Sequence, residues 1–202
     1  MSAEASGETT IAAEARRGGG EEVSPPGDPA SDGCVALRLD AARWSESLGD
    51  TEAVTRRAVI AALEAAKVDP AAVELSVLLI DDNASQALNA RHRGRNAATN
   101  VLSWPAFSLD APLNASAIDG LAAGAPDALV FLGDLAVAFE TTLREAEAQS
   151  KSLDAHYSHL IVHGVLHLLG YDHQSETDAG AMEATEIAAL SAIGVADPYA
   201  DG

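Results

Sequence analysis

Residues 163–173 read His163-Gly164-Val165-Leu166-His167-Leu168-Leu169-Gly170-Tyr171-Asp172-His173. Two of these histidines stand four positions apart, and the third follows six positions later. From 160 to 169, every position except 163, 164 and 167 is leucine, isoleucine or valine. This predicts a helix that is apolar nearly all round and therefore buried. Five of the chain's 6 histidines fall between positions 156 and 173, and no Lys or Arg follows Lys151. This clustering is the strongest chemical signal in the chain.

The spacing of the histidines suits a bound metal ion. On a helix, residues four positions apart share a face with β-carbons about 5–6 Å apart, so His163 and His167 can bind one ion. His159 belongs to the same stripe but lies about 12 Å along the axis from His167, too far for the same ion. A third ligand must therefore come from chain that turns back. Gly170 permits the left-handed helix end after which His173 can return.

Three imidazole ligands are typical of a catalytic zinc site. They leave the fourth position of a tetrahedral zinc open to water, whereas structural sites are closed. Burial disfavours the charged imidazolium and so favours the neutral form that binds metals. The alternative is a set of core histidines hydrogen-bonded to the backbone. We predict one Zn²⁺ per chain, held by His163, His167 and His173, with Asp172 either orienting one of their rings or serving the turn alone.

The same histidine spacing occurs in the metzincin zinc peptidases, which place a glutamate general base next to the first histidine. Here that position is Gly164, which argues against a peptidase of that kind. A phosphate group fits the charges better, because Arg91, Arg93 and Arg95 form the densest positive cluster and guanidinium groups pair bidentately with phosphate oxygens. Taken alone, the same cluster is also typical of a solvated loop.

Outside this segment, alternating and helical patterns predict a small sheet and several helices. Strands are predicted over residues 34–39, 73–80, 100–104 and 129–137. Helices are predicted over residues 50–67, 83–88, 139–150, 154–169 and 176–193, and a long surface loop over residues 107–127. Strands and helices are interspersed at first and helices dominate the end. This order indicates an α+β fold class: a single domain with a four-stranded mixed sheet packed against about five helices. The pattern leaves the strand order open.

Composition divides the chain into a tail and a domain. Residues 1–32 hold seven acids against two arginines and little apolar surface, which predicts a disordered acidic N-terminal tail. Residues 33–202 form the predicted domain. Hydrophobic residues make up 48% of the chain, enough for a full core at this size.

Charge and cysteine content exclude several classes of protein. The chain has 12 Lys and Arg against 31 Asp and Glu, a formal charge of −19, which is unlike a DNA-wrapping or polybasic membrane-binding protein. No run approaches the roughly 18 apolar residues of a membrane span. Cys34 is the only cysteine, which excludes an intramolecular disulfide and is typical of a reducing compartment. We therefore expect a cytoplasmic protein with neither DNA nor a membrane as partner.

Several stretches of the chain are similar to one known family. They are residues 163–173, then Leu88-Asn89 through Arg93-Gly94 to Thr99-Asn100-Val101-Leu102-Ser103-Trp104-Pro105, then Leu132-Gly133-Asp134-Leu135, and the ending Asp197-Pro198-Tyr199. Over roughly residues 34–199 the chain resembles the bacterial YbeY family of metal-dependent endoribonucleases, also called rRNA maturation factors. The stretch at residues 163–173 is highly specific to this family.

This resemblance implies a fold, an activity and roles for single residues. It implies an α+β fold with a four-stranded sheet, His163, His167 and His173 as zinc ligands, and Arg93 as the essential basic residue beside the metal. It further implies cleavage of single-stranded RNA, maturation of small-subunit ribosomal RNA including its 3′ end, ribosome quality control, and work with the small ribosomal subunit and its proteins. The chain departs from the family pattern in Trp104, where Phe is usual, in a longer loop at residues 107–127, and in its acidic tail.

The resulting hypothesis is a zinc-dependent endoribonuclease in which Arg93 and the metal ligand His163 are the catalytic candidates. Arg91 and Arg95 are further candidates for RNA contact. Because the net charge is so negative, we expect RNA to bind only at this small basic cleft, with ribosomal partners supplying the remaining affinity. The nucleophile is either water activated by the metal or the substrate's 2′-hydroxyl.

Two alternatives to this hypothesis are open. One is a non-catalytic ribosome-assembly protein in which a structural zinc locks the last helices to the sheet. The other is a zinc hydrolase of a different substrate, with Asp134 in place of the missing glutamate. Within a strand, however, Gly133-Asp134 is more simply interpreted as a β-bulge or turn.

Overall fold

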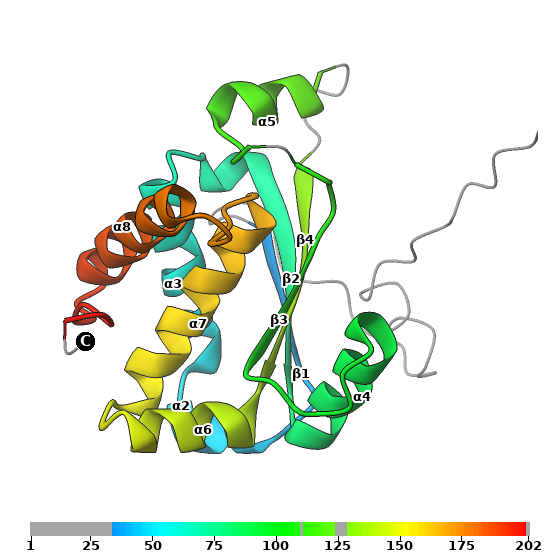
Figure 1. Cartoon of the computed structure of the whole chain (residues 1–202), viewed down its shortest axis with the longest axis vertical. Helices are drawn as coiled ribbons and strands as arrows, with labels where there is room; N and C mark the ends of the chain where they lie inside the picture. Colours follow the sequence, from blue (N-terminus) through cyan, green and yellow to red (C-terminus); the bar gives the residue numbers. More distant parts are fainter. Residues whose placement is uncertain (1–33, 110, 124–128, 201–202) are drawn as a thin grey trace, which may run out of the picture.

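The computed structural model describes residues 34–109, 111–123 and 129–200 (Figure 1). The predicted acidic tail, residues 1–32, lies outside the described residues, and its disorder stays a prediction. Within these ranges, no helix has both the length and the apolar character needed to cross a membrane.

Four strands form one mixed sheet, as predicted. They are β1 (Cys34–Leu39), β2 (Val73–Ile80), β3 (Val101–Pro105) and β4 (Val130–Ala138), in the spatial order β1-β2-β4-β3. β1, β2 and β4 run parallel, whereas β3 pairs antiparallel with β4 at one edge. Parallel neighbours need crossover connections, which the intervening helices provide. In the described part of the chain, β3 therefore has one long side without a strand partner.

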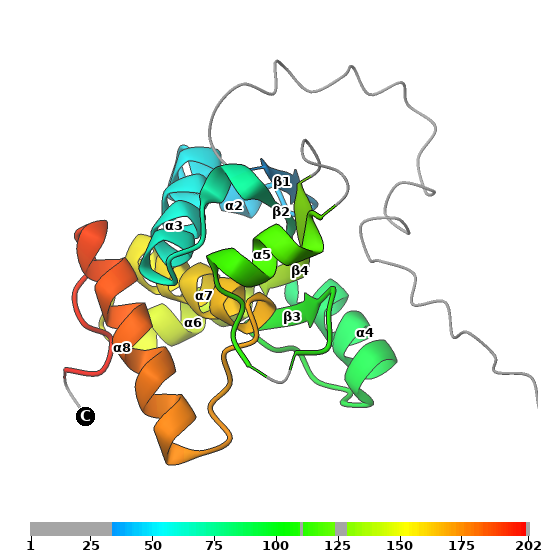
Figure 2. The same cartoon turned by 90° about the horizontal axis from the view of Figure 1, so that it is seen from above.

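Helices cover both faces of the sheet (Figures 1 and 2). On one face lie α3 (Thr51–Ala65) and α7 (Leu153–Leu168), with α8 (Glu176–Ala192) packed against both. α4 (Asp82–Arg93) lies on the opposite face, over a small second core of Ile80, Leu102 and Ala136. α2 (Arg43–Leu48), η1 (Pro70–Ala72), α5 (Ala115–Leu121) and α6 (Phe139–Ala148) complete the fold. The arrangement confirms the predicted α+β class.

α7 is the central helix of the main core. Ser152 caps its start by accepting a hydrogen bond from the backbone N–H of Ala155 at 3.2 Å. From Leu160 to Leu168 its leucine, isoleucine and valine side chains are buried, and each stabilises the fold by about 1.5–3 kcal/mol relative to an exposed side chain. Gly164 faces β4 so closely that a β-carbon there would lie 2.9 Å from Cδ2 of Leu135. The close approach of α7 to the sheet therefore depends on glycine at this position.

One predicted loop contains a helix. Residues 107–127 were predicted as a loop, and that prediction was wrong for Ala115–Leu121, which form α5. Asn114 caps α5 by accepting a hydrogen bond from the N–H of Ala117, and Ile118 is its buried residue. A helix this short has one apolar anchor instead of a periodic stripe, so hydrophobic periodicity gives no signal.

Two further helices differ from the prediction. α2 was missed because its six residues contain one buried side chain, Trp44. The helix predicted over residues 83–88 continues to Arg93 as α4 and ends at Gly94, whose φ of 68° is left-handed. With α2 and α5, the described residues form seven α-helices instead of about five. The longer α4 matters most here, because its last turn carries Arg93.

A β-bulge interrupts β4 beside the end of β3. The register between β2 and β4 shifts between Glu74 and Ser76. Gly133 has a φ of 134°, and a β-carbon there would lie 2.1 Å from the carbonyl oxygen of Trp104. Only glycine fits such an approach, so the bulge interpretation of Gly133-Asp134 is confirmed.

Candidate metal centre and its cavity

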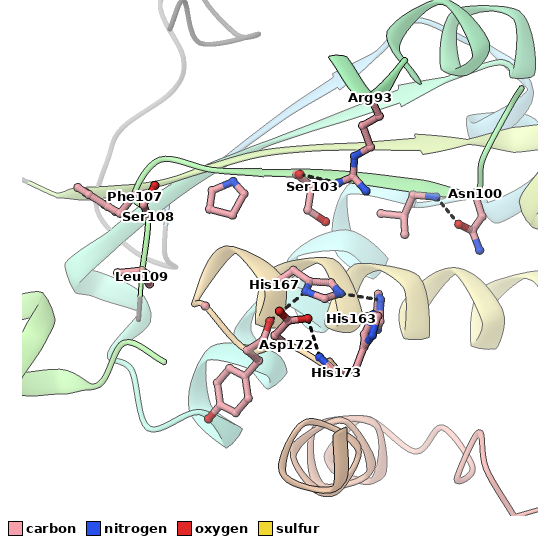
Figure 3. Close-up of a pocket in the computed structure, with 14 residues that line it drawn as sticks. Arg93, Asn100, Ser103, Phe107, Ser108, Leu109, His163, His167, Asp172 and His173 are labelled. Atoms are coloured by element: carbon pink, nitrogen blue, oxygen red, sulfur yellow. Dashed lines mark hydrogen bonds between the residues drawn. The ribbon is translucent and has the colours of Figure 1, made fainter. Parts of the chain in front are cut away.

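Three histidine rings converge at the end of α7 (Figure 3). His163 and His167 project from the same face of the helix, and their Nε2 atoms lie 3.1 Å apart. His173 comes from the turn after the helix. One ring nitrogen from each of the three histidines lies within 4.8 Å of the other two. These three side chains can therefore bind one metal ion.

A glycine turn brings His173 back to the other two rings. Gly170 has a left-handed φ of 88°. Its N–H donates to the carbonyl of His167 at 3.0 Å, and the N–H of Tyr171 donates to the carbonyl of Leu166 at 3.0 Å. This pair of hydrogen bonds is the Schellman motif, which needs a residue that tolerates positive φ. The turn predicted from the sequence is confirmed.

The hydrogen bonds of the first two histidines leave both Nε2 atoms free for a metal. The Nδ1–H of His163 donates to Oε1 of Glu186 at 2.7 Å. The Nδ1–H of His167 donates to the backbone carbonyl of Tyr171 at 3.0 Å. A neutral imidazole carries one N–H, so each Nε2 then presents a lone pair. Two lone pairs that face each other repel unless a cation lies between them, so this arrangement fits a metal ion.

Glu186 was not recognised from the sequence. It comes from α8, its side chain is buried, and it also accepts a hydrogen bond from the hydroxyl of Tyr199. Burial raises its pKa, but the hydrogen bonds from His163 and Tyr199 and the ring of His159, 3.6 Å away, outweigh this and lower the pKa from 4.5 to about 2. A signal existed in the sequence, because the buried positions of α8 form a helical stripe that includes this one carboxylate.

Burial keeps His167 in the neutral form. Desolvation is the largest influence, and together with the neighbouring His163 it lowers the pKa of His167 below the usual 6.5. The hydrogen bond to the carbonyl of Tyr171 acts in the opposite direction and is outweighed. His167 is therefore unprotonated at neutral pH, as a metal ligand must be.

A cavity of about 680 Å³ opens above the three rings (Figure 3). It lies between β3 with its following segment, the end of α7, and the turn that carries His173. Its lining consists of Arg93, Asn100, Val101, Ser103, Pro105, Phe107, Ser108, Leu109, His163, His167, Gly170, Tyr171, Asp172 and His173. Within this lining, Asp172 is the one carboxylate and Arg93 the one guanidinium.

The chain matches a known protein family over most of its length. The family model described as Endoribonuclease YbeY matches residues 40–194. The chain belongs to the YbeY family.

Three relatives named Endoribonuclease YbeY cover most of the chain. That of Paramagnetospirillum magneticum is 43% identical over 83% of this chain and 96% of its own length. Those of Rhodopseudomonas palustris strain HaA2 and Bradyrhizobium diazoefficiens are 44% and 45% identical, over 77% and 75% of this chain and 76% and 78% of their own lengths. Among solved structures, the solution structure of TM1509 from Thermotoga maritima matches with 18% identity and a TM-score of 0.48, covering 79% of this chain and 91% of that one.

The arginine that the resemblance to the YbeY family singles out lies at the cavity. Arg93 is exposed at the end of α4, and its side chain extends past β3 toward the cavity (Figure 3). One of its terminal nitrogens donates to the carbonyl of Ser103 at 3.1 Å. This contact holds the guanidinium across the cavity from the histidine rings. The three imidazole rings and one positive charge thus face the same space.

The two other arginines of the cluster do not line this cavity. Arg91 and Arg93 are two positions apart in α4, and at 3.6 residues per turn their side chains leave the helix in nearly opposite directions. Arg95 follows the left-handed Gly94, so its direction is set by the turn. Both are exposed, and their contact with RNA stays a prediction.

The two acidic residues singled out from the sequence, Asp172 and Asp134, have surroundings different from those of Glu186. Asp172 accepts hydrogen bonds from the backbone N–H of His173 at 2.7 Å and from the side chain of Gln174. These are turn contacts, and no hydrogen bond joins Asp172 to a histidine ring within the described residues. Asp134 is buried in β4 and is not part of the cavity lining. Its position offers no support for a hydrolase that uses Asp134 as its acid.

Proposed function

We propose that the chain is a zinc-dependent endoribonuclease that cleaves single-stranded RNA. Membership of the YbeY family supports this proposal, because the relatives are named endoribonucleases. The observation that carries it is the shared cavity, where three imidazoles face one another and Arg93 lies opposite them. We further propose that the protein acts in the cytoplasm on small-subunit ribosomal RNA, including its 3′ end, and in ribosome quality control.

The residues of the site divide the work of phosphodiester cleavage. His163, His167 and His173 would hold the zinc, which supplies a Lewis acid for phosphoryl oxygens and for the nucleophile. Arg93 binds the scissile phosphate and stabilises the negative charge that develops on it. Glu186 fixes the ring of His163 and keeps its proton on Nδ1. Among the described lining residues the one carboxylate is Asp172, which accepts hydrogen bonds within its own turn, so the substrate's 2′-hydroxyl is a candidate nucleophile beside water.

The charge distribution restricts where RNA binds. The arginines at positions 38, 43, 56, 57 and 144 each pair with a carboxylate between 2.6 and 3.7 Å away. Among the described residues, Arg93 of the cluster at the end of α4 is the one Lys or Arg that lines the cavity, and we propose that RNA binds at this cluster. We propose that ribosomal proteins or folded rRNA supply the affinity that this small cluster lacks.

Cleavage of an RNA that carries a small-subunit rRNA 3′ end tests the nuclease proposal. Wild type and Arg93→Ala are compared at equal, verified zinc content and equal thermal stability. We expect the wild type to cut and the variant to lose most of its kcat/KM, because the guanidinium acts on the phosphate in the transition state. Arg93→Lys, which keeps the charge but loses the bidentate geometry, should recover part of the rate. Equal rates for all three proteins would contradict the proposal.

A non-catalytic assembly protein with a structural zinc is the second candidate. One contact favours it: the ligand His163 is hydrogen-bonded to Glu186 of α8, so the metal site joins α7 to the last helix. In that case, zinc removal by a chelator should unfold the protein, and Arg93→Ala should leave the cellular role intact. A metal-free protein that keeps its circular dichroism spectrum but loses RNA cleavage would favour the nuclease.

A further inference from the structure

The cavity above the histidines has two chemically different halves. One half carries Arg93, Asn100 and the histidine rings, and the other is formed by Pro105, Phe107 and Leu109. Figure 3 shows Phe107 and Leu109 at one end of the cavity and Asn100 at the other. Binding and cleavage of a phosphodiester require only the polar half. The apolar half has no part in the chemistry proposed above.

The apolar half is a firmly held wall. Phe107 and Leu109 are partly buried and pack against the main core. The segment that carries them is tied down by backbone hydrogen bonds from Ala106 and Leu113, each 2.8 Å long. Leu109 also packs against Gly170, where a β-carbon would lie 2.8 Å from its Cδ1. An apolar surface fixed in this way binds a flat ligand at little entropic cost.

The dimensions of the cavity exceed those of a phosphate group. Its volume of about 680 Å³ falls within the range of pockets that hold organic ligands. Ser103, whose carbonyl binds Arg93, and Phe107 are four residues apart, which is at most about 13 Å at roughly 3.3 Å per residue. At about 3.4 Å per stacked nucleotide, this span corresponds to no more than about four nucleotides. A strand with one phosphate at Arg93 can therefore place a base from a nearby nucleotide against Phe107.

We infer that the apolar half of the cavity is a subsite for an unpaired nucleobase close to the scissile phosphate. This inference rests on the proposed nuclease function and deepens it. The base packs against Phe107 and Leu109 while Arg93 holds the phosphate. Unstacked bases of single-stranded RNA are bound in this manner by aromatic side chains, largely independently of sequence. A paired base cannot enter the subsite without leaving its helix, which gives a physical reason for cleavage of single strands.

The polar half argues for a nucleobase over other apolar ligands. A lipid chain or an apolar peptide side chain that filled this wall would leave Arg93 and the three imidazoles without an anionic partner. A nucleotide supplies a flat apolar group and an anion on one small molecule. The wall and the positive charge are parts of one continuous cavity, so one ligand can satisfy both.

Removal of single bases from the RNA tests the subsite on the wild-type protein. The zinc-loaded full chain is given an unstructured oligoribonucleotide, the cleaved bond is mapped, and abasic nucleotides are then placed one at a time around that bond. We expect one abasic position within about four nucleotides of the bond to raise KM about tenfold, in line with the loss of one base–aromatic stack, and more distant positions to change it little. Equal cleavage of every abasic RNA would overturn the inference while the nuclease proposal stands. Absence of any RNA cleavage would overturn both.

Variants of the wall complete the test. Phe107→Ala should raise KM for intact RNA by a similar factor and remove the penalty of the sensitive abasic position, whereas Phe107→Tyr, which keeps an aromatic ring, should keep that penalty. Leu39→Ala is the control, because Leu39 is an exposed apolar side chain of β1 outside this cavity. If Phe107→Ala does not fold, the abasic series on the wild-type protein still tests whether the subsite exists. An abasic penalty that persists unchanged in folded Phe107→Ala contradicts the assignment to this wall.

Discussion

The ring of His163 is held by a carboxylate from a different helix. Glu186 accepts the Nδ1–H of this ring at 2.7 Å and is itself held by the hydroxyl of Tyr199. An outer partner of this kind fixes the tautomer and the ring direction of a metal ligand and makes the ligand more basic. Metal affinity should therefore depend on Glu186 although it does not face the metal.

Glu186→Gln should lower the affinity for zinc by about 10- to 100-fold, as loss of an outer partner does in other metal sites. The neutral amide stabilises a partial positive charge on the ring less well than a carboxylate. Competition with a fluorescent zinc chelator measures the affinity. Glu183→Gln is the matched control, because Glu183 is exposed on the same helix. Equal zinc affinity of the two variants would contradict a role for Glu186 in holding the ligand.

At the scale of elements, a glycine sets how closely α7 approaches the sheet. Gly164 lies between His163 and His167 in the sequence and faces Leu135 of β4. The position at which metzincins carry a glutamate is therefore a packing position here. Any side chain at 164 must push α7 and β4 apart or displace the buried Leu135.

Gly164→Ala should destabilise the protein by about 1–3 kcal/mol, because the added methyl overpacks the contact with Leu135. Gly180→Ala should do the reverse and stabilise by about 0.5–1 kcal/mol, because it adds a better helix former in α8 where no atom lies within 4 Å of the new β-carbon. Urea unfolding followed by circular dichroism measures both. Changes of equal sign and size would show that helix propensity, and not packing, governs position 164.

At the scale of the whole molecule, buried histidines couple stability to pH. Burial is the main cause that lowers the pKa of His156 and His167 below 6.5 in the folded protein. Below about pH 6.5 the unfolded chain therefore binds more protons than the folded chain, and the free energy of unfolding falls as the pH decreases. Glu186, with its pKa lowered from 4.5 to about 2, adds a further loss only below about pH 4.5.

The zinc-free protein should accordingly have its full stability above pH 6.5 and lose stability between pH 6.5 and 5.5. Each additional proton bound by the unfolded chain contributes about 1.4 kcal/mol per pH unit. Urea midpoints at pH 7.5, 6.5 and 5.5 measure the slope. In His156→Gln the slope should be shallower. A midpoint that stays constant over this range would exclude neutral buried histidines as the cause.

The sparse positive charge makes a second prediction for the whole molecule. If the three arginines at positions 91, 93 and 95 neutralise one phosphate each, log K for single-stranded RNA should fall with log salt at a slope of about −2. Arg95→Ala should reduce the slope by about 0.7. Arg57→Ala should not, because Arg57 pairs with Asp154 at 3.7 Å. Fluorescence anisotropy with zinc-free protein gives these slopes, and a much steeper one would reveal a larger RNA-binding surface.

Patterns with a regular period predicted the fold well. The alternation in the strands and the apolar positions of α7 and α8 led to the correct sheet size and fold class. α2 and α5 were not predicted, because each buries a single side chain, Trp44 in α2 and Ile118 in α5. One buried residue produces no hydrophobic periodicity. The strand order could not be predicted from the sequence either. The packing of the whole sheet, and not any single strand, determines which strands become neighbours.

The convergence of the three histidines is a local property, and the sequence alone determined it. The helical rise sets the distance from His163 to His167, and Gly170 turns the chain back within a few residues. Only the tertiary structure decided what surrounds them. Glu186 arrives from α8, 23 positions beyond His163, and Phe107 comes from the segment after β3. Contacts between residues so far apart in the chain depend on how the elements pack in the common core, and no short-range pattern records that packing.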